Sequence, residues 1–232
     1  MILFNGVSID SIGKVMIEDI RVSPIRYNPV VRPRAIRFGS EFVRMVGGER
    51  TVTISFAILD ADMIERHESV MNLSAWAKTD KEYRLELPTD PNKYLECVCT
   101  SKPDPSARAW WENKLKLVFT CYSNPYWTNK QLKSVACGTQ FVVLGDAPPL
   151  MTIERTLTSA ASNQSYSDGT NTMTFSSIPT GNMVIDLNNQ TAAVGSTSIM
   201  QYYQPSGAFI IPKTGAQTIT GTGTVKYRER FE

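Results

Sequence analysis

The stretch from Lys114 to Trp127 constrains this chain most, because its pattern is that of a strand running into a stop. Leu115, Leu117 and Phe119 alternate with other residues, which is typical of a strand with one buried face. Proline has no N–H for a sheet ladder, so the Asn-Pro pair should end that strand near residue 123. Two aromatic residues come next, and they are compatible with a joint between two packed units or with an ordinary strand end covered by hydrophobic side chains. The candidate interdomain joint is Pro125, Tyr126 and Trp127.

Composition changes at the same place. About a quarter of the residues before Trp127 are charged, against about one in eight after it. A chain of 232 residues is long enough to form two modest hydrophobic cores. We therefore predict two domains, over residues 1–130 and 131–232, in a mainly β protein with one α-helix.

Charge and hydropathy exclude several classes of protein. A formal net charge of +2 offers no strong electrostatic footprint for nucleic acid, so we expect no nucleic-acid binding. The longest apolar runs fall far short of the roughly 20 residues of a membrane helix, so we expect no membrane insertion. The opening residues lack the basic and apolar regions of a secretion signal, which predicts a protein made in a cytoplasm.

The four cysteines, Cys97, Cys99, Cys121 and Cys137, fit that compartment. Their spacing is not that of a zinc site, and reduced thiols are the norm in a cytoplasm. We predict free thiols, no metal and no cofactor.

The first domain is predicted to be mostly antiparallel sheet. Asn5-Gly6 between apolar residues indicates a small hairpin, and Gly47-Gly48 indicates a second hairpin turn that leads into the alternating strand 51–58. Apolar spacing then predicts one helix from about Asp60 to Lys78. Further strands are expected over residues 83–87 and 94–99.

Residues 20–34 hold three prolines with arginines between them, which is typical of an extended segment outside the core. Arginine's planar fork suits contacts to a neighbouring subunit, and a solvated loop is the other interpretation. The candidate subunit-interface residues are Arg21, Arg26, Arg32, Arg34 and Arg37.

The second half shows short β-branched segments with Gly, Asn and Pro between them and no helical pattern, which predicts a β-sandwich. The expected strands cover residues 139–144, 150–157, 172–175, 183–187, 208–211, 217–220 and 224–230.

No catalytic constellation is visible in the sequence. The single histidine, His67, has no partner in the pattern for a triad or a metal set, and phosphate-binding and nucleophile motifs are absent, so we predict that the chain is not an enzyme. A carbohydrate-binding adhesion module is the alternative function, since exposed aromatics beside amides can hold sugars. The candidate sugar-binding residues are Tyr166, Tyr202 and Tyr203.

The order of these parts resembles the distal tail protein family of siphophages. The resemblance rests on short motifs spread over nearly the whole chain: Phe4-Asn-Gly, Gly47-Gly-Glu-Arg, the helix ending near Trp76, Asn124-Pro-Tyr-Trp127, Leu144-Gly-Asp-Ala-Pro-Pro149, Val184-Ile-Asp-Leu187 and Thr224-Val-Lys-Tyr-Arg-Glu-Arg-Phe231.

The resemblance implies a virion structural protein of a phage or prophage tail tip, or baseplate. Members form hexameric rings through the N-terminal domain and carry a galectin-like, carbohydrate-module-like β-sandwich outside the ring. The ring joins the tail tube to the host-adsorption apparatus. The implied partners are further copies of the chain, the tail-tube protein, the tail-associated lysin and receptor-binding proteins. This chain matches the short form, which has no inserted sugar-binding module.

Overall fold

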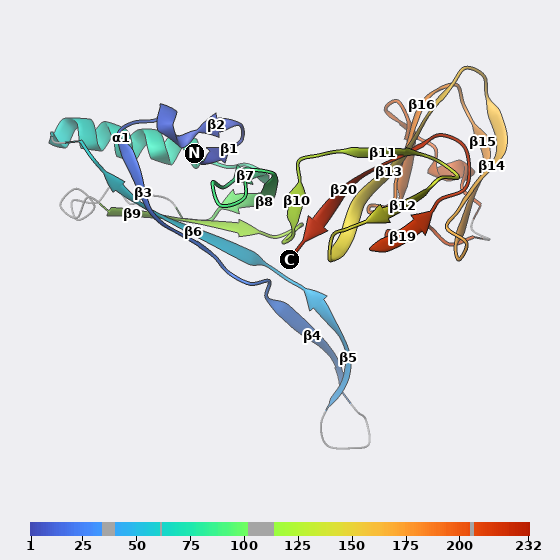
Figure 1. Cartoon of the computed structure of the whole chain (residues 1–232), viewed down its shortest axis with the longest axis horizontal. Coiled ribbons are helices and arrows are strands. Elements are labelled where there is room, and N and C mark those ends of the chain that lie inside the picture. The colour runs from blue at the N-terminus through green and yellow to red at the C-terminus, as the bar shows by residue number, and fades with distance from the viewer. Residues whose placement is uncertain (34–39, 61, 102–113, 205–206) are drawn as a thin grey trace. The chain divides into compact units, whose positions relative to one another are not determined.

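The computed structural model of the chain describes all residues except 34–39, 61, 102–113 and 205–206, and only the backbone of 32–33, 40–47 and 114 (Figure 1). The chain forms two compact units, Met1–Trp127 with Glu232, and Thr128–Phe231. Both are built mainly from antiparallel strands, so the predicted mainly β class with one long helix is confirmed for the described residues.

The first unit is an antiparallel sheet with strand order β3-β6-β9-β8-β7-β1-β2 and a separate ribbon of β4 and β5. Its elements are β1 (Leu3–Phe4), β2 (Val7–Ser8), η1 (Ile9–Ser11), β3 (Val15–Val22), β4 (Tyr27–Pro33), β5 (Ser40–Gly47), β6 (Arg50–Ile58), α1 (Met63–Trp76), β7 (Tyr83–Glu86), β8 (Lys93–Cys99) and β9 (Lys114–Cys121).

The core of this unit lies between the sheet and α1. The alternation predicted for β6 is confirmed, because Val52, Ile54 and Phe56 are all buried. Val70 and Leu73 of α1 belong to the same apolar cluster, and they anchor the helix through its buried stripe. The helix ends at a tryptophan that continues this packing into the aromatic side chains of β1 and β9.

The Asn-Gly prediction is confirmed at the first hairpin. β1 and β2 pair directly, and Asn5 and Gly6 between them have φ of 51° and 76°. Positive φ at both central residues matches the twist of the flanking strands, and glycine adopts it without steric cost.

The predicted hairpin turn at Gly47-Gly48 is wrong. β5 pairs with β4, and β6 pairs with β3 and β9, so Gly48 lies in a bend along one long ladder. Gly48 is required there for space, since a Cβ would lie 2.6 Å from the carbonyl oxygen of Arg26. Pairing with a distant segment therefore determines this glycine's role.

The second unit contains a sheet with order β18-β17-β16-β13-β20-β11 and the two-stranded sheets β12-β19 and β14-β15. Its elements are β11 (Lys133–Ala136), β12 (Gln140–Val143), β13 (Ala147–Leu157), β14 (Ala161–Ser167), β15 (Thr172–Ile178), β16 (Gly181–Asp186), β17 (Thr191–Val194), β18 (Thr197–Ser198), η2 (Met200–Tyr202), β19 (Gly215–Thr218) and β20 (Thr224–Phe231); β10 (Trp127–Asn129) lies at the boundary between the units.

The strands enclose a large apolar core. Met151, Ile153, Phe175, Ile185 and Val225 are each at most 1% exposed within it. The strand predicted over residues 208–211 is wrong: this segment has no regular structure, although its Phe and first Ile are buried. β11, β14 and β17 were not predicted.

No helix within the described residues is long and apolar enough to cross a bilayer.

Candidate functional site

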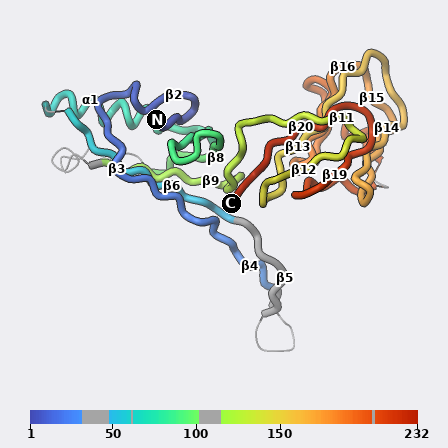
Figure 2. The backbone as a smooth tube through the Cα atoms, in the orientation of Figure 1, coloured from blue at the N-terminus to red at the C-terminus, as the bar shows by residue number. Residues whose placement is uncertain are grey.

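The ribbon of β4 and β5, here called the arm, is the feature of the first unit that suits contact with another molecule. The arm continues the β3-β6 ladder (Figure 1), and the first part of β4 leads away from the sheet that α1 covers (Figures 1 and 2). A two-stranded ribbon on its own is marginally stable in water, so an arm of this kind gains stability from packing against a partner.

Backbone and hydroxyl bonds hold the base of the arm. The N–H of Arg26 donates to the carbonyl of Glu49 over 3.0 Å, and the N–H of Gly48 donates to the carbonyl of Arg26 over 2.8 Å. Nearby, the hydroxyl of Ser23 accepts the N–H of Thr51 over 2.9 Å. A cavity of about 290 Å³ lies at this bend and is lined by Ser23, Pro24, Ile25, Arg26, Glu49 and Thr51.

The described side chains of the arm leave apolar surface open to solvent. Tyr27, Val30 and Val31 are 39%, 39% and 53% exposed. Such adjacent apolar side chains on a thin ribbon suit burial at a protein interface. The Tyr27 hydroxyl donates to the Glu232 carboxylate, and this hydrogen bond, with some burial, raises the pKa of Tyr27 to about 12. The tyrosine therefore stays protonated at physiological pH.

The five predicted interface arginines are only partly described. Arg21 is exposed and forms an ion pair of 2.5 Å with Asp19, and Arg26 is exposed beside the cavity at the bend. Arg32 lies at the end of β4, and only its backbone is described; Arg34 and Arg37 lie outside the described residues. The role of all five at a subunit interface stays a prediction.

A second, more polar hollow of about 470 Å³ lies beside the β1-β2 turn. Glu82 at its wall accepts the N–H groups of Tyr122 and Ser123 over 2.8 and 2.9 Å and so ties the end of β9 to the start of β7. Burial alone would raise the pKa of Glu82, but these hydrogen bonds outweigh it and lower the pKa. The full lining is Asn5, Gly6, Lys81, Glu82, Tyr83, Arg84, Glu86 and Glu96.

This hollow was not predicted from the sequence, because its residues come from two segments more than 70 positions apart with no shared motif. Both carboxylates and cationic side chains line the hollow, so its charge is mixed. The guanidinium of Arg84 lies over the ring of Tyr94, 4.4 Å from the ring centre, which is a packing role. The arrangement favours a charged contact surface over acid–base chemistry.

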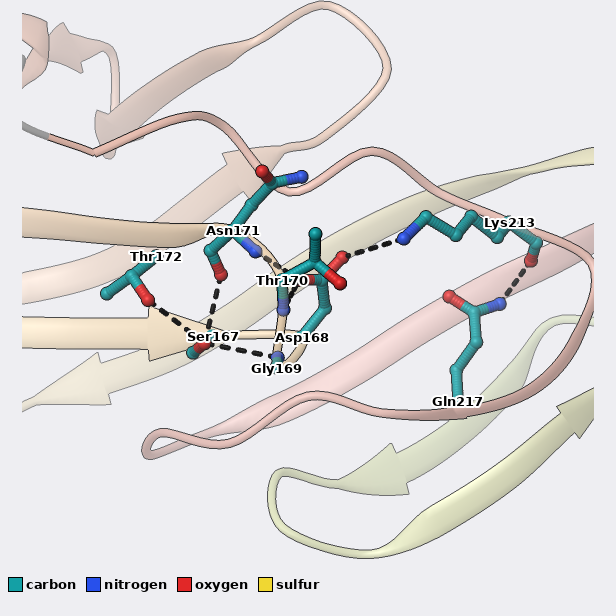
Figure 3. Close-up of polar contacts among 8 residues, drawn as sticks. All are labelled: Ser167, Asp168, Gly169, Thr170, Asn171, Thr172, Lys213 and Gln217. Carbon is teal, nitrogen blue, oxygen red and sulfur yellow. Dashed lines mark hydrogen bonds and ion pairs between the residues drawn. The ribbon is translucent and has the colours of Figure 1, made fainter.

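In the second unit, the turn between β14 and β15 forms a compact polar network (Figure 3). The Asp168 carboxylate accepts the N–H groups of Thr170 and Asn171 over 2.9 and 2.6 Å, and Lys213 approaches it at 3.4 Å. Burial alone would raise the pKa of Asp168, but the backbone donors and the lysine outweigh it, so the pKa is lowered. The two backbone bonds lie within the turn, and Lys213 ties the turn to the segment before β19, so these contacts give Asp168 a structural role.

The three candidate sugar-binding tyrosines have structural surroundings. Tyr166 is 0% exposed, so its ring offers no surface on which a sugar could stack in this structure. Tyr202 and Tyr203 are half-buried against the core, at and just after η2. The Tyr203 ring lies 5.8 Å from that of Phe175 and 5.2 Å from that of Phe209. Their predicted role in sugar binding has no direct support in this packing.

The predicted joint residues are placed at the end of the first unit. Pro125 is buried, Tyr126 is half-buried, and Trp127 packs against the apolar core of the first unit. Their role in holding two domains together stays a prediction.

Within the described residues, no group of three or more His, Cys, Asp or Glu side chains is arranged to hold a metal ion. The four cysteines are free thiols in the structure.

Comparison with solved structures identifies a known fold for this chain. No known family profile matches the chain, and no curated protein is significantly similar in sequence. Among solved structures, the chain is similar to SPP1 Dit, described as a paradigm of the hub adsorption apparatus in phages that infect Gram-positive bacteria. The identity is 14% and the TM-score 0.75, over 100% of this chain and 98% of that chain.

Weaker similarity is found to chains of the phage p2 baseplate in its activated conformation. The identity is 9% with a TM-score of 0.48 for the Sr form, over 94% of this chain and 91% of that chain. It is 8% with a TM-score of 0.44 for the Ca form, over 95% and 91%. The SPP1 Dit comparison shows that this chain has the Dit fold over its whole length, as its resemblance to the distal tail proteins implied.

Proposed function

We propose that this chain is a structural subunit of a phage tail tip, which assembles into a ring between the tail tube and the host-adsorption apparatus. The observation that carries the proposal is the full-length fold similarity to SPP1 Dit, whose own description is that of a hub. Neither unit has to supply chemistry in this role. The function is to hold other proteins in place, on the virion.

The first unit is the proposed ring-forming domain. The apolar side chains of Tyr27, Val30 and Val31 on the arm are exposed in the isolated chain and would be buried against a neighbouring copy. The arginines of the same region would add polar contacts at the rim of that interface. Six copies per ring is the stoichiometry implied by the resemblance to the distal tail proteins.

The proposed partners follow from the same role: further copies of this chain, a tail-tube protein, a tail-associated lysin and receptor-binding proteins. The second unit is proposed as the outward-facing β-sandwich of the ring. A direct sugar-binding role is not proposed, since the candidate tyrosines pack into or against the core.

The test is the mass of the full-length chain in solution, measured by light scattering over a range of concentrations, with negative-stain imaging of the same samples. A ring is expected to give six times the chain mass of 25.9 kDa. Concentration must be varied because oligomers dissociate by mass action. A monomer at every concentration, with the tail-tube protein also failing to induce rings, would reject the proposal.

A pair of matched variants tests the arm. Val31→Glu places a charge on an arm residue that is 53% exposed, and it should reduce the ring to smaller species. Leu144→Glu places the same charge on a residue of the second unit that is 71% exposed, and it should leave the ring intact. If both variants formed rings as readily as the wild type, the arm would not be the interface.

A further inference from the structure

Two cysteines of the first unit lie opposite each other on neighbouring antiparallel strands. The register between β8 and β9 pairs Cys99 with Phe119 and Val98 with Thr120, so the next residues in register are Cys97 and Cys121. Both cysteine side chains are 0% exposed and belong to the unit's apolar core. The neighbouring Cys121 thiol is also the largest cause of the raised pKa of the Cys97 thiol.

The hydrogen-bond pattern identifies the kind of pair. The N–H of Thr100 donates to the carbonyl of Val118 over 2.8 Å, so these two residues form a hydrogen-bonded pair. Pairs alternate along an antiparallel ladder, which makes Cys97 and Cys121 a non-hydrogen-bonded pair. The Cα atoms of such a pair are about 4.5 Å apart and the side chains are close. A disulfide needs Cα atoms about 4.4–6.8 Å apart, so the strands are already at bonding distance.

We propose that Cys97 and Cys121 are a cross-strand dithiol, a modification site at which a two-electron thiol oxidant closes a disulfide that links β8 covalently to β9. The bond would close a loop over the whole connection between the two strands. The site does not depend on the proposed role in a phage tail, since it rests only on the geometry of the first unit.

The chemistry balances with an azo compound such as diamide as the oxidant. One thiol, as its thiolate, adds to a nitrogen of the N=N bond. The sulfur of the second cysteine then attacks the first sulfur and displaces the nitrogen group, so that the S–S bond forms as the S–N bond breaks. The two thiol protons and the two electrons end on the azo group, which becomes a hydrazine.

The same surroundings keep the pair reduced until such an oxidant is present. Interaction with the Cys121 thiol and burial both raise the pKa of the Cys97 thiol, and the nearby groups Cys99 and Glu82 oppose a negative charge there as well. The thiolate is therefore scarce at neutral pH. Because only the thiolate reacts, the closure rate should rise with pH between pH 7 and 9.

The other thiols are poorer partners. Cys99 lies on the same face of β8 as Cys97, but two residues along one strand are about 6.8 Å apart, at the limit for a disulfide. Its thiol donates to the carbonyl of Ser101 over 2.9 Å, and the residue opposite it is Phe119. Cys137 belongs to the second unit.

The experiment treats the folded full-length chain with diamide at pH 7, 8 and 9 and follows free thiols and intact mass. Two of the four thiols should disappear, with a mass loss of about 2 Da that dithiothreitol reverses. Peptide mapping without reductant should find Cys97 joined to Cys121. Four free thiols after long incubation at pH 9, or a disulfide that joins a different pair, would overturn the proposal.

Serine variants provide matched controls. Cys97→Ser and Cys121→Ser should each abolish the loss of two thiols, whereas Cys137→Ser should leave the crosslink unchanged. Circular dichroism establishes that each variant is folded. If a core variant does not fold, the mapping of the wild-type disulfide and its dependence on pH decide the question alone.

Discussion

Replacing Gly48 with alanine should loosen the base of the arm without unfolding the first unit. The added Cβ would lie 2.6 Å from the carbonyl oxygen of Arg26 and 2.9 Å from the side-chain amide nitrogen of Asn28. The oxygen belongs to the backbone and cannot rotate away, so the two strands must separate locally. The hydrogen bonds that Arg26 makes with Gly48 and Glu49 are the first that this separation would break.

The magnitude follows from those two bonds. Each contributes about 1 kcal/mol net, so their loss costs about 2 kcal/mol. Alanine returns about 0.5 kcal/mol by lowering the entropy of the unfolded chain. The net cost of about 1.5 kcal/mol is local to the bend and corresponds to about tenfold faster amide exchange there.

Hydrogen exchange measured by mass spectrometry resolves this effect by segment. Peptides from residues 20–30 and 48–55 should exchange faster in Gly48→Ala, while peptides of α1 and β9 should not change. Gly6→Ala is the control: its Cβ meets nothing within 4 Å but its φ is +76°, so the cost of about 1 kcal/mol falls on the β1-β2 turn instead. Wild-type exchange at the base of the arm in Gly48→Ala would refute the reasoning.

Three further outcomes are expected. Ser69→Ala removes a 2.6 Å hydrogen bond to the buried carboxylate of Asp60 and should lower the free energy of unfolding by about 2 kcal/mol in urea titrations; an unchanged midpoint would contradict this. Trp127→Ala should lower the free energy of unfolding of the first unit by about 2 kcal/mol, which is less than the loss of a fully buried aromatic ring would cost. Proteolytic cleavage of the variant between residues 122 and 146 should increase. Burial alone would raise the pKa of Glu229, but hydrogen bonds from Lys133 and a backbone N–H lower it below the ordinary 4.5. The stability that the ionised Glu229 contributes is therefore complete above about pH 4.5 and is lost as pH falls through the lowered pKa. Glu229→Gln should flatten the acid limb of a curve of unfolding free energy against pH.

The elements predicted correctly are those that nearby residues specify. Asn5-Gly6 sets its own turn geometry through positive φ, and the alternation over residues 51–58 places one face of β6 in the core whatever it pairs with. The helix of residues 63–76 follows from its apolar spacing in the same way. The resemblance in motif order identified the fold that structural comparison then confirmed.

The strands of the second unit that were not predicted are polar or short. β14, with sequence Ala-Ser-Asn-Gln-Ser-Tyr-Ser, shows no alternation of apolar residues, and it becomes a strand because β15 supplies a ladder for it. β17 is similarly set by its pairing with β16. Residues 208–211 carry the apolar pattern of a strand but bury two side chains with no ladder partner assigned to them.

Only the tertiary structure decided which side chains are available for contact. Tyr166 lies in the polar segment Ala-Ser-Asn-Gln-Ser-Tyr-Ser, which gives no sign of burial, yet its side chain is 0% exposed. The bend at Gly48 and the facing thiols of Cys97 and Cys121 likewise depend on register between segments that are distant in the chain. Local sequence specifies turns and buried faces through short-range geometry, whereas strand partners are chosen by the free energy of burying the whole sheet.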